Sequence, residues 1–333
     1  MKLSGNNLKL PRRSVSGVLL FDKAKGFSSN QALQQVKRLY RAEKTGHTGT
    51  LDPLASGLLP LMFGEATKFA SDLIDADKTY RATVRLGFSS TTGDAEGVIE
   101  PASGRDVRCI LESEVHVACA RFVGELDQTP PMYSALKKDG KPLYAYARQG
   151  VAIERQARAI HIRQLQVLSV EYAEDAVLLT FLATCSKGTY VRTLAEDIAI
   201  ELGTAGYLVE LRRTDIGELS TQDALTLEQL IAMGDDFSRL DAVLKPVDGL
   251  LTHLDQVILN NEFALRFLHG QRLPLSSVEA KSGRVRVYGE ASEQYVQNTP
   301  QGKAFHFLGT GILETDGKNA LLRPDRLLQV KNL

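Results

Sequence analysis

The sequence of 333 residues contains no tryptophan and only three cysteines. Because Cys109, Cys119 and Cys185 are scattered without a C-x-x-C pair, both a disulfide framework and a structural zinc site are disfavoured. No stretch approaches the roughly 20 apolar residues that a membrane span needs, and Met1–Ser16 lacks the apolar segment of a signal peptide. These absences favour a cytoplasmic protein that has no membrane partner.

An excess of basic charge is also missing, since Lys+Arg and Asp+Glu both number 40. A nonspecific polyanion binder usually carries a basic excess, so any RNA site must be local. Three basic clusters are candidates, although each one also fits an ordinary solvated face of mixed charge. They are Lys37, Arg38, Arg41 and Lys44; Lys137, Lys138 and Lys141; and Arg212 with Arg213.

The composition is that of a folded globular protein, with 43% apolar and 24% charged residues. Because the length exceeds one average domain, we predict a large domain over residues 1–248 and a smaller one over residues 249–333. In the second domain, short β-rich segments separated by turns favour a small barrel-like unit. Its predicted strands are residues 257–260, 284–289, 305–313 and 327–330.

The first domain mixes strands and helices in irregular order. Gly17–Phe21 is an apolar run suited to a buried strand, and Ser28 can cap a helix that follows it. Thr79–Gly87 alternates between apolar and polar residues, which places Tyr80 on the buried face of a strand. Without a repeating βαβ unit, we predict an α+β fold with a mixed, largely antiparallel sheet and flanking helices. Further strands are predicted at 159–170, 176–185 and 207–213, and helices at 66–73, 112–122, 193–202 and 226–233.

The most informative segment is Gly46–Pro53, which reads Gly-His-Thr-Gly-Thr-Leu-Asp-Pro and lies within a Gly- and Pro-rich stretch, Thr45–Pro60. We interpret this stretch as a structured loop. Glycine permits tight turns, and the proline restricts Asp52 toward extended conformations, so the bend can hold the carboxylate of Asp52 out of the core. An ordinary Asp-Pro turn without any function would show the same pattern of residues.

A second polar group, Lys187–Arg192, follows an apolar strand. Tyr190 and Arg192 are two residues apart, so they share a face if the strand continues. An arginine at this place could pair with a carboxylate and hold it ionised. The alternative is a plain strand end at the surface.

A competing motif is Asp75-Ala-Asp77-Lys-Thr79, which matches the D-x-D-x-T opening of magnesium-dependent phosphotransferases. That motif should follow a buried strand, whereas here a helix is predicted before it. Patterns typical of a hydrolase elbow, a P-loop and a zinc protease are absent from the sequence. These classes are therefore disfavoured.

The segment Gly46–Pro60 resembles the signature of the tRNA pseudouridine synthase B family. Three further segments similar to that family follow in order, and the resemblance covers roughly residues 17 to 245. They are Lys78–Ala82, Thr129–Lys137 and Gly188–Leu194. The tail, with Phe307–Gly311 and Leu322–Arg326, is similar to the PUA-like RNA-binding domain of these enzymes.

The resemblance implies the pseudouridine synthase fold and a role for seven residues. Asp52 would be the catalytic aspartate, with Tyr80 stacked on the target base and Arg192 paired with the aspartate. His47 would hold the T-loop, while Tyr190, Leu211 and Lys23 would bind substrate. One departure is visible, because Ala24 replaces the proline of the family's Lys-Pro-x-Gly motif, which affects the rigidity of the first loop.

The activity implied is conversion of uridine 55 in the T-arm of tRNA into pseudouridine, by a monomer that has no obligate protein partner. The reaction breaks the bond from ribose C1′ to base N1 and joins C1′ to C5, so it needs neither cofactor nor metal. A carboxylate could attack C1′ or remove a C2′ proton, and both alternatives stay open. A pure RNA-binding protein and a guide-RNA-dependent relative are the remaining rivals.

Overall fold

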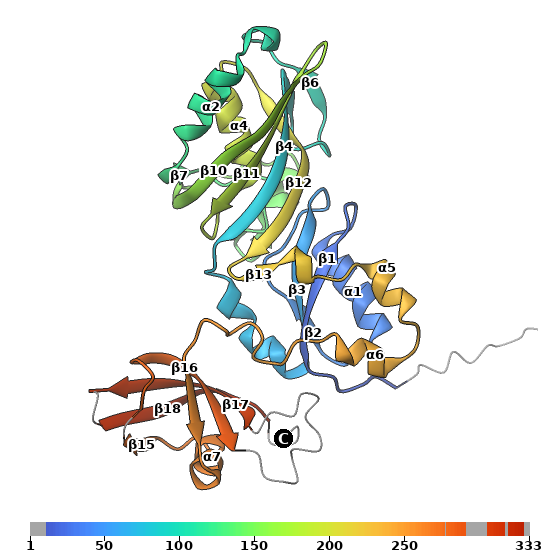
Figure 1. Cartoon of the computed structure of the whole chain (residues 1–333). Helices are drawn as coiled ribbons and strands as arrows, with labels where there is room; N and C mark the ends of the chain where they lie inside the picture. Colours follow the sequence, from blue (N-terminus) through green and yellow to red (C-terminus); the bar gives the residue numbers. More distant parts are fainter. Residues whose placement is uncertain (1–10, 277, 291–304, 317–318, 330–333) are drawn as a thin grey trace, which may run out of the picture.

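The computed structural model describes residues 11–276, 278–290, 305–316 and 319–329. Two large sheets organise the chain, one of nine strands and one of five, and helices flank both (Figure 1). The nine-stranded sheet has the order β1-β3-β12-β4-β11-β10-β7, with β2 paired to β3 and β13 paired to β12. These strands are β1 Gly17–Lys23, β2 Thr45–His47, β3 Ser56–Phe63, β4 Lys78–Leu86, β7 Gly124–Gln128, β10 Arg158–Tyr172, β11 Val177–Cys185, β12 Gly206–Ile216 and β13 Leu219–Ser220.

Strand pairing in this sheet is antiparallel except between β12 and β3, which run parallel. The alternation predicted for β4 is confirmed, because Ala82, Val84 and Leu86 are buried while Arg81 is exposed. β4 lies between β11 and β12 at the centre of the sheet, where apolar side chains on one face are covered. The predicted α+β fold with a mixed, largely antiparallel sheet is therefore confirmed.

Helices cover the sheet in two groups (Figure 1). α2 (Glu112–Ala120) and α4 (Val191–Glu201) share one hydrophobic core with β4, β10 and β11, and α1 (Ser29–Leu39) shares a second core with β1 and β3. Ser28 caps α1 in a capping box, as predicted. The remaining short elements are β5 Phe88–Ser90, β6 Ile99–Pro101, η2 Val107–Cys109, β8 Lys137–Lys138, β9 Lys141–Pro142, α3 Leu143–Ala147, η3 Thr221–Asp223, α5 Leu227–Ala232 and α6 Phe237–Ala242.

The expected loop at Thr45–Pro60 was wrong in part, because β2 and β3 occupy its ends and leave only residues 48–55 irregular. The strand before Tyr190, whose continuation was left open, does not continue: α4 begins at Val191, after a turn at Gly188 with φ +81° that ends the extended conformation. The helix predicted at 66–73 is confirmed and is a 3-10 helix, η1 (Gly64–Leu73).

The C-terminal unit is a five-stranded sheet with its own core, in the order β14-β16-β17-β18-β15. Helix α7 and strand β15 were not predicted. The strand expected at 327–330 is wrong, because β18 ends at Leu327; position 330 lies outside the described residues. The elements are β14 Gln256–Leu259, α7 Asn261–Leu268, β15 Leu273–Ser276, β16 Gly283–Glu290, β17 Phe305–Thr315 and β18 Asn319–Leu327.

The two units meet at η1. The ammonium of Lys68 donates to the carbonyl of Leu327 at 2.8 Å, and Arg326 Nη1 donates to Ser71 Oγ at 2.9 Å. Arg284 forms an ion pair with the buried side chain of Asp72. The domain boundary between residues 248 and 249 stays a prediction.

Among the described residues, no helix has both the length and the apolar character needed to cross a bilayer.

Candidate active site

Asp52 lies in the irregular segment 48–55 between β2 and β3, and hydrogen bonds from two directions hold this bend. The hydroxyl of Ser29, in the first turn of α1, accepts from Leu51 N at 2.8 Å and lies 3.0 Å from Leu51 O, to which it can donate. Ala55 N donates to the carbonyl of Asp52 at 3.1 Å and closes a turn. The backbone on both sides of the carboxylate is therefore fixed, while its side chain stays 45% exposed.

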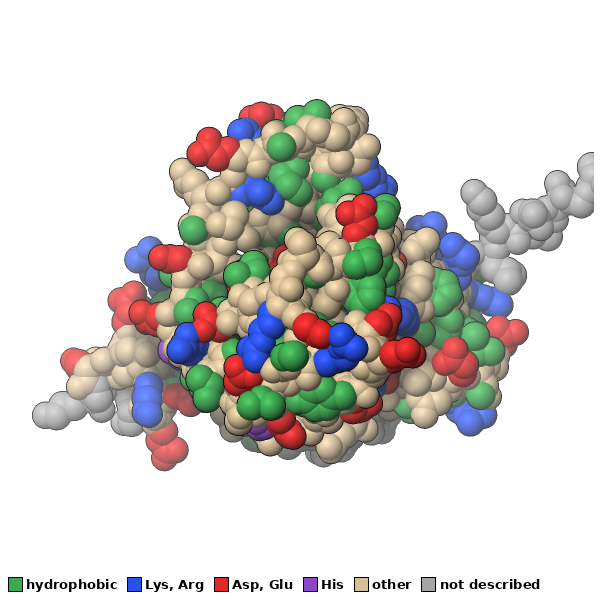
Figure 2. All heavy atoms as spheres, turned by 90° about the horizontal axis from the view of Figure 1, so that it is seen from above, with side chains coloured by type: hydrophobic (Ala, Val, Ile, Leu, Met, Phe, Trp, Pro, Cys, Tyr) green, Lys and Arg blue, Asp and Glu red, His purple; other side chains and the backbone are tan. Residues whose placement is uncertain are grey.

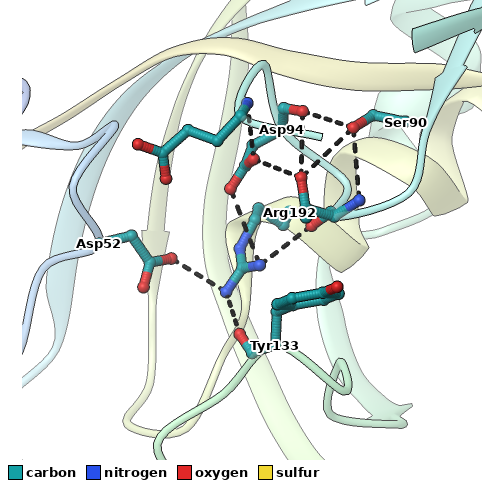
Figure 3. A network of polar contacts seen from close by, with 7 residues as sticks. Asp52, Ser90, Asp94, Tyr133 and Arg192 are labelled. Carbon is teal, nitrogen blue, oxygen red and sulfur yellow. Dashed lines mark hydrogen bonds and ion pairs between the residues drawn. The ribbon is translucent and has the colours of Figure 1, made fainter. Parts of the chain in front are cut away.

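Arg192 meets this carboxylate from α4 (Figure 3). Its Nη2 lies 3.0 Å from Asp52 Oδ2, and the arginine side chain is only 6% exposed. Two backbone carbonyls orient the guanidinium, because Nη1 donates to Thr92 O at 3.0 Å and Nη2 donates to Tyr133 O at 2.6 Å. The structure thus brings Asp52 and Arg192 together as the sequence predicted, although through a helix rather than a strand.

A second carboxylate, Asp94, lies behind the same guanidinium (Figure 3). Its Oδ2 is 3.8 Å from Arg192 Nη1, and its side chain is 4% exposed. Asp94 Oδ1 accepts from Thr92 Oγ1 at 2.6 Å and from Glu96 N at 3.1 Å. Sequence reasoning missed Asp94, although an acid that follows Ser- and Thr-rich sequence in a glycine turn was a usable signal.

Electrostatics at Asp52 result from opposing causes. Burial raises the pKa of Asp52 above its ordinary value, the guanidinium of Arg192 lowers it, and the negative charge of Asp94 raises it again. The carboxyl group reaches solvent, but dense protein around it still makes the charged form costly. The net direction is upward, so Arg192 offsets only part of the cost of desolvation.

If Asp52 is the catalytic aspartate that the sequence predicts, only its ionised form can act as nucleophile or base. A raised pKa means that this form is lost earlier as the pH falls, so we expect the single-turnover rate to decline at a higher pH than for an ordinary aspartate, about tenfold per pH unit below the pKa. A rate–pH profile measured with pre-bound substrate checks this. A profile that stays flat down to the ordinary range of aspartate would contradict it.

Tyr80 on β4 and Leu211 on β12 lie where two cores meet. Both side chains are partly buried and pack against the α4-side core and the α1-side core. Leu211 pairs with Ala82, and Arg213 pairs with Tyr80, so these side chains leave the sheet on the same face. Burial raises the pKa of Tyr80, with Arg213 acting against it, so the phenol stays protonated. These cores contain Leu51 and Leu54, which flank Asp52, so Tyr80 packs against the bend that carries the carboxylate.

Tyr190 is the N-cap of α4 and is clamped by the side chain of Gln128. Tyr190 N donates to Gln128 Oε1 at 2.7 Å, and Gln128 Nε2 donates back to Tyr190 O at 3.2 Å. Burial raises the pKa of the Tyr190 phenol, with the nearby Ser134 hydroxyl acting against it. Gln128 and Ser134, both buried, are further residues that sequence reasoning did not assign.

Lys23 is fully buried at the end of β1, and its ammonium donates to Ala24 O at 3.0 Å and to Phe27 O at 2.7 Å. Burial lowers the pKa of Lys23 to about 8, while Asp52 and Glu96 act in the opposite direction. These two carbonyl bonds hold the first loop even though alanine stands in the proline position.

His47 ends β2 and lines a groove of about 610 Å³ beside the Asp52 bend. The groove continues along η1 to Lys68 and to Arg326 of the C-terminal unit. Among the described residues, the buried Nδ1 of His47 has no hydrogen-bond partner. Burial and the charge of Arg213 lower the pKa of His47, so the neutral imidazole is favoured.

One of the three basic clusters is not a surface cluster. Arg212 forms an ion pair with Asp22 at 2.6 Å, and Arg213 is only 1% exposed. This candidate therefore does not form a surface cluster, because adjacent strand residues point to opposite faces, and here one is buried and the other is paired. Figure 2 shows Lys and Arg interspersed with Asp and Glu on the face seen from above, in agreement with a neutral chain.

The phosphotransferase motif is not assembled. Asp75 pairs with Lys187 at 2.5 Å and Asp77 with Arg163 at 3.1 Å, and the segment follows η1 rather than a buried strand. In the described part of the chain, no three acidic, histidine or cysteine side chains are grouped as a metal site.

The fold can be compared with that of solved structures. A chain of "Structure of H/ACA RNP bound to a substrate RNA containing 2'-deoxyuridine" superposes with a TM-score of 0.67 and 20% identity, covering 95% of this chain and 86% of that chain. A chain of "Crystal Structure of a Cbf5-Nop10-Gar1 Complex" gives a TM-score of 0.65 and 21% identity, with the same coverage. These likenesses show that the chain shares the fold of those two chains.

Sequence comparisons identify the family. The profile "TruB family pseudouridylate synthase (N terminal domain)" matches residues 37–191, and two TruB C-terminal profiles match residues 192–252 and 256–328. The "tRNA pseudouridine synthase B" of Burkholderia mallei is 56% identical over 84% of this chain and 89% of its own length. That of Ralstonia nicotianae is 50% identical over 97% of both. The chain belongs to the TruB family of pseudouridylate synthases.

Proposed function

We propose that this enzyme converts uridine 55 in the T-loop of tRNA into pseudouridine, with Asp52 as the catalytic carboxylate. One observation carries the proposal: a half-exposed carboxylate lies 3.0 Å from a buried guanidinium, Arg192, on a bend whose apolar residues pack in the same cores as Tyr80. The names of relatives at 50% and 56% identity support tRNA as the substrate. Neither a cofactor nor a metal enters the proposed reaction.

The chemistry is an isomerisation in which all atoms are retained. The C1′–N1 bond breaks, the detached uracil turns, C1′ bonds to C5, and the proton of C5 is exchanged for one at N1. Whether Asp52 attacks C1′ or removes a C2′ proton, the ionised carboxylate is the reactive form. Arg192 sustains that charge in both cases.

The target base must leave the RNA stack, at a cost of a few kcal/mol. We assign Tyr80, Leu211 and Tyr190 to the surfaces that retain the base. His47, with its unpaired buried nitrogen, is assigned to binding the nucleotides around it. Lys23 was predicted to bind substrate, but its ammonium is buried and donates to Ala24 O and Phe27 O, so we assign it to holding the first loop. The protein is proposed to act in the cytoplasm as a monomer, without a guide RNA or an obligate protein partner.

The test is turnover by the purified protein alone. An unmodified tRNA transcript, folded in monovalent salt with EDTA, should yield pseudouridine at position 55 and nowhere else. A transcript with cytidine at position 55 is the control. A requirement for added guide RNA, protein or magnesium after the RNA is folded would overturn the proposal, as would modification at another position.

Replacing Tyr80 should separate base retention from proton transfer. Tyr80→Ala is expected to weaken RNA binding by about 1–3 kcal/mol, because it removes base–aromatic stacking. Tyr80→Phe should bind like the wild type, and any loss of turnover in this variant measures the contribution of the hydroxyl. Fluorescence titration together with single-turnover assays checks both. Equal binding by the Ala and Phe variants would exclude stacking on Tyr80.

A further inference from the structure

Arg213 is a charged residue at the centre of the main sheet for which the mechanism above has no use. It lies on β12, between β3 and β4, and is 1% exposed. In the strand register it is the partner of Tyr80 on β4 and of Gly57 on β3. Its backbone and side chain therefore connect the strand that carries Tyr80 with the strand that follows the Asp52 bend.

The guanidinium of Arg213 binds the bend directly. Nη2 donates to Gly49 O at 2.7 Å, and Nε donates to Leu58 O at 2.8 Å. Two N–H groups of one planar guanidinium, called its fork below, thus bind a carbonyl three residues before Asp52 and another six residues after it. A lysine would offer a single ammonium instead of two planar N–H groups at fixed separation.

Two glycines accommodate this arginine. Gly49 has φ +67°, and a Cβ added there would lie 3.1 Å from Arg213 Nη1. At Gly57, with φ +102°, a Cβ would lie 2.2 Å from the backbone oxygen of Arg213. A side chain at Gly49 would press on the guanidinium, whereas Gly57 permits the close approach of β3 to the backbone of β12, so only Gly49 lies against the arginine side chain itself.

The charge of Arg213 is not balanced by an acid. Within the described part of the chain, no carboxylate lies at ion-pair distance from it, in contrast to Arg212, which pairs with Asp22. A buried cation held by carbonyls alone is costly, and an apolar side chain could fill the space at lower cost. The arginine is therefore explained by what it holds rather than by the stability that it adds.

We propose that Arg213 is a positioning residue of the pseudouridylation reaction, which holds the Asp52 bend in place relative to Tyr80 through the carbonyls of Gly49 and Leu58. The inference rests on the proposed function, because it assigns Arg213 a part in the same reaction. Arg213 acts through the bend, whereas Arg192 touches the carboxylate itself.

The variant Arg213→Lys keeps the charge but loses the fork. When the same fraction of RNA is bound by the variant and the wild type, the single-turnover rate of the variant should be about 100-fold lower. A displacement of about 1 Å in a reacting group can reduce a rate by that factor. The dissociation constant for tRNA should stay within about threefold of the wild type, because uniform binding is not affected. Arg85→Lys, on the exposed side of neighbouring strand β4, is the matched control and should keep the wild-type rate.

The pH profile distinguishes positioning from partial unfolding. Three charged groups shift the pKa of Asp52: Arg192 from α4, Asp94 from the turn after β5, and Lys23 from β1. A displaced carboxylate loses contact with Arg192, so the acid limb of the profile should move to higher pH in Arg213→Lys. A smaller folded fraction would lower the rate at every pH and leave the limb unmoved, and that result would overturn the proposal.

Hydrogen exchange gives a readout that does not depend on activity. Backbone amides of residues 48–55 should exchange at least about tenfold faster in Arg213→Lys, while those of α2 stay unchanged. If Arg213→Lys does not fold, Gly49→Ala perturbs the same contact from the loop side and should give the same two changes. Should the wild type fail to modify tRNA, the proposed function is wrong, yet exchange still decides whether Arg213 holds the bend. Unchanged exchange in both variants would overturn the inference.

Discussion

Asp52→Asn is expected to abolish pseudouridine formation while leaving tRNA binding within about threefold of the wild type. The amide has the size of the carboxylate but can neither attack C1′ nor accept a C2′ proton, so the rate should fall at least about 10³-fold. Folding should be retained, because the Asp52 side chain is 45% exposed and its backbone bonds are unchanged. Release of tritium from 5-tritiated uridine in tRNA measures the rate.

Asp75→Asn is the matched control, since Asp75 is an exposed acid paired only with Lys187. It should keep the wild-type rate, which also tests the phosphotransferase alternative. Turnover by Asp52→Asn comparable with that of the Asp75→Asn control would refute the assignment of the catalytic carboxylate.

The second large effect is expected at Arg192. Arg192→Met leaves Asp94 buried without its cation, which should cost about 3–5 kcal/mol of folding free energy. It also removes the charge that sustains the ionised form of Asp52, so activity should fall at least about 100-fold in the molecules that fold. Thermal unfolding and single-turnover assays measure the two effects separately.

The double variant Arg192→Met/Asp94→Asn should recover much of the lost stability, because the buried acid is then neutral. Its activity should stay low, since Asp52 still has no cation beside it. If adding Asp94→Asn does not restore the stability of Arg192→Met, then the lost folding free energy does not come from the unpaired carboxylate of Asp94. Recovery of activity together with stability would show that Arg192 has no direct part in the reaction.

The pairing of Asp52 with Arg192 was implied by the family resemblance, whereas local patterns indicated only the bend and an arginine that could pair with a carboxylate. Glycines and a proline around Asp52 signal an irregular bend, and a strand with strict alternation places Tyr80 on the buried face of β4. The centre of the sheet was predictable for the same reason: period-two patterns are read directly from residues. The helix that carries Arg192 was predicted over 193–202, but its start was placed two residues late, because only a single glycine, Gly188, signals the turn before it.

The parts that were missed depend on contacts between distant segments. Asp94 lies near Arg192 although nearly a hundred residues separate them in the sequence. Arg213, on β12, donates to the carbonyl of Gly49 in the bend after β2. No local pattern distinguishes a buried arginine from an exposed one when both stand in a strand beside each other, as Arg212 and Arg213 do. Only the pairing of β12 with β3 and β4 decides between them.

The central claim is that this protein forms pseudouridine 55 through Asp52, and mapping of pseudouridine in cellular tRNA tests it most directly. Cells that lack the gene should carry unmodified uridine at position 55. The wild-type gene should restore the modification, while the Asp52→Asn gene, expressed at the same level, should not. Pseudouridine that persists at position 55 without the gene, or that returns with Asp52→Asn, would contradict the account.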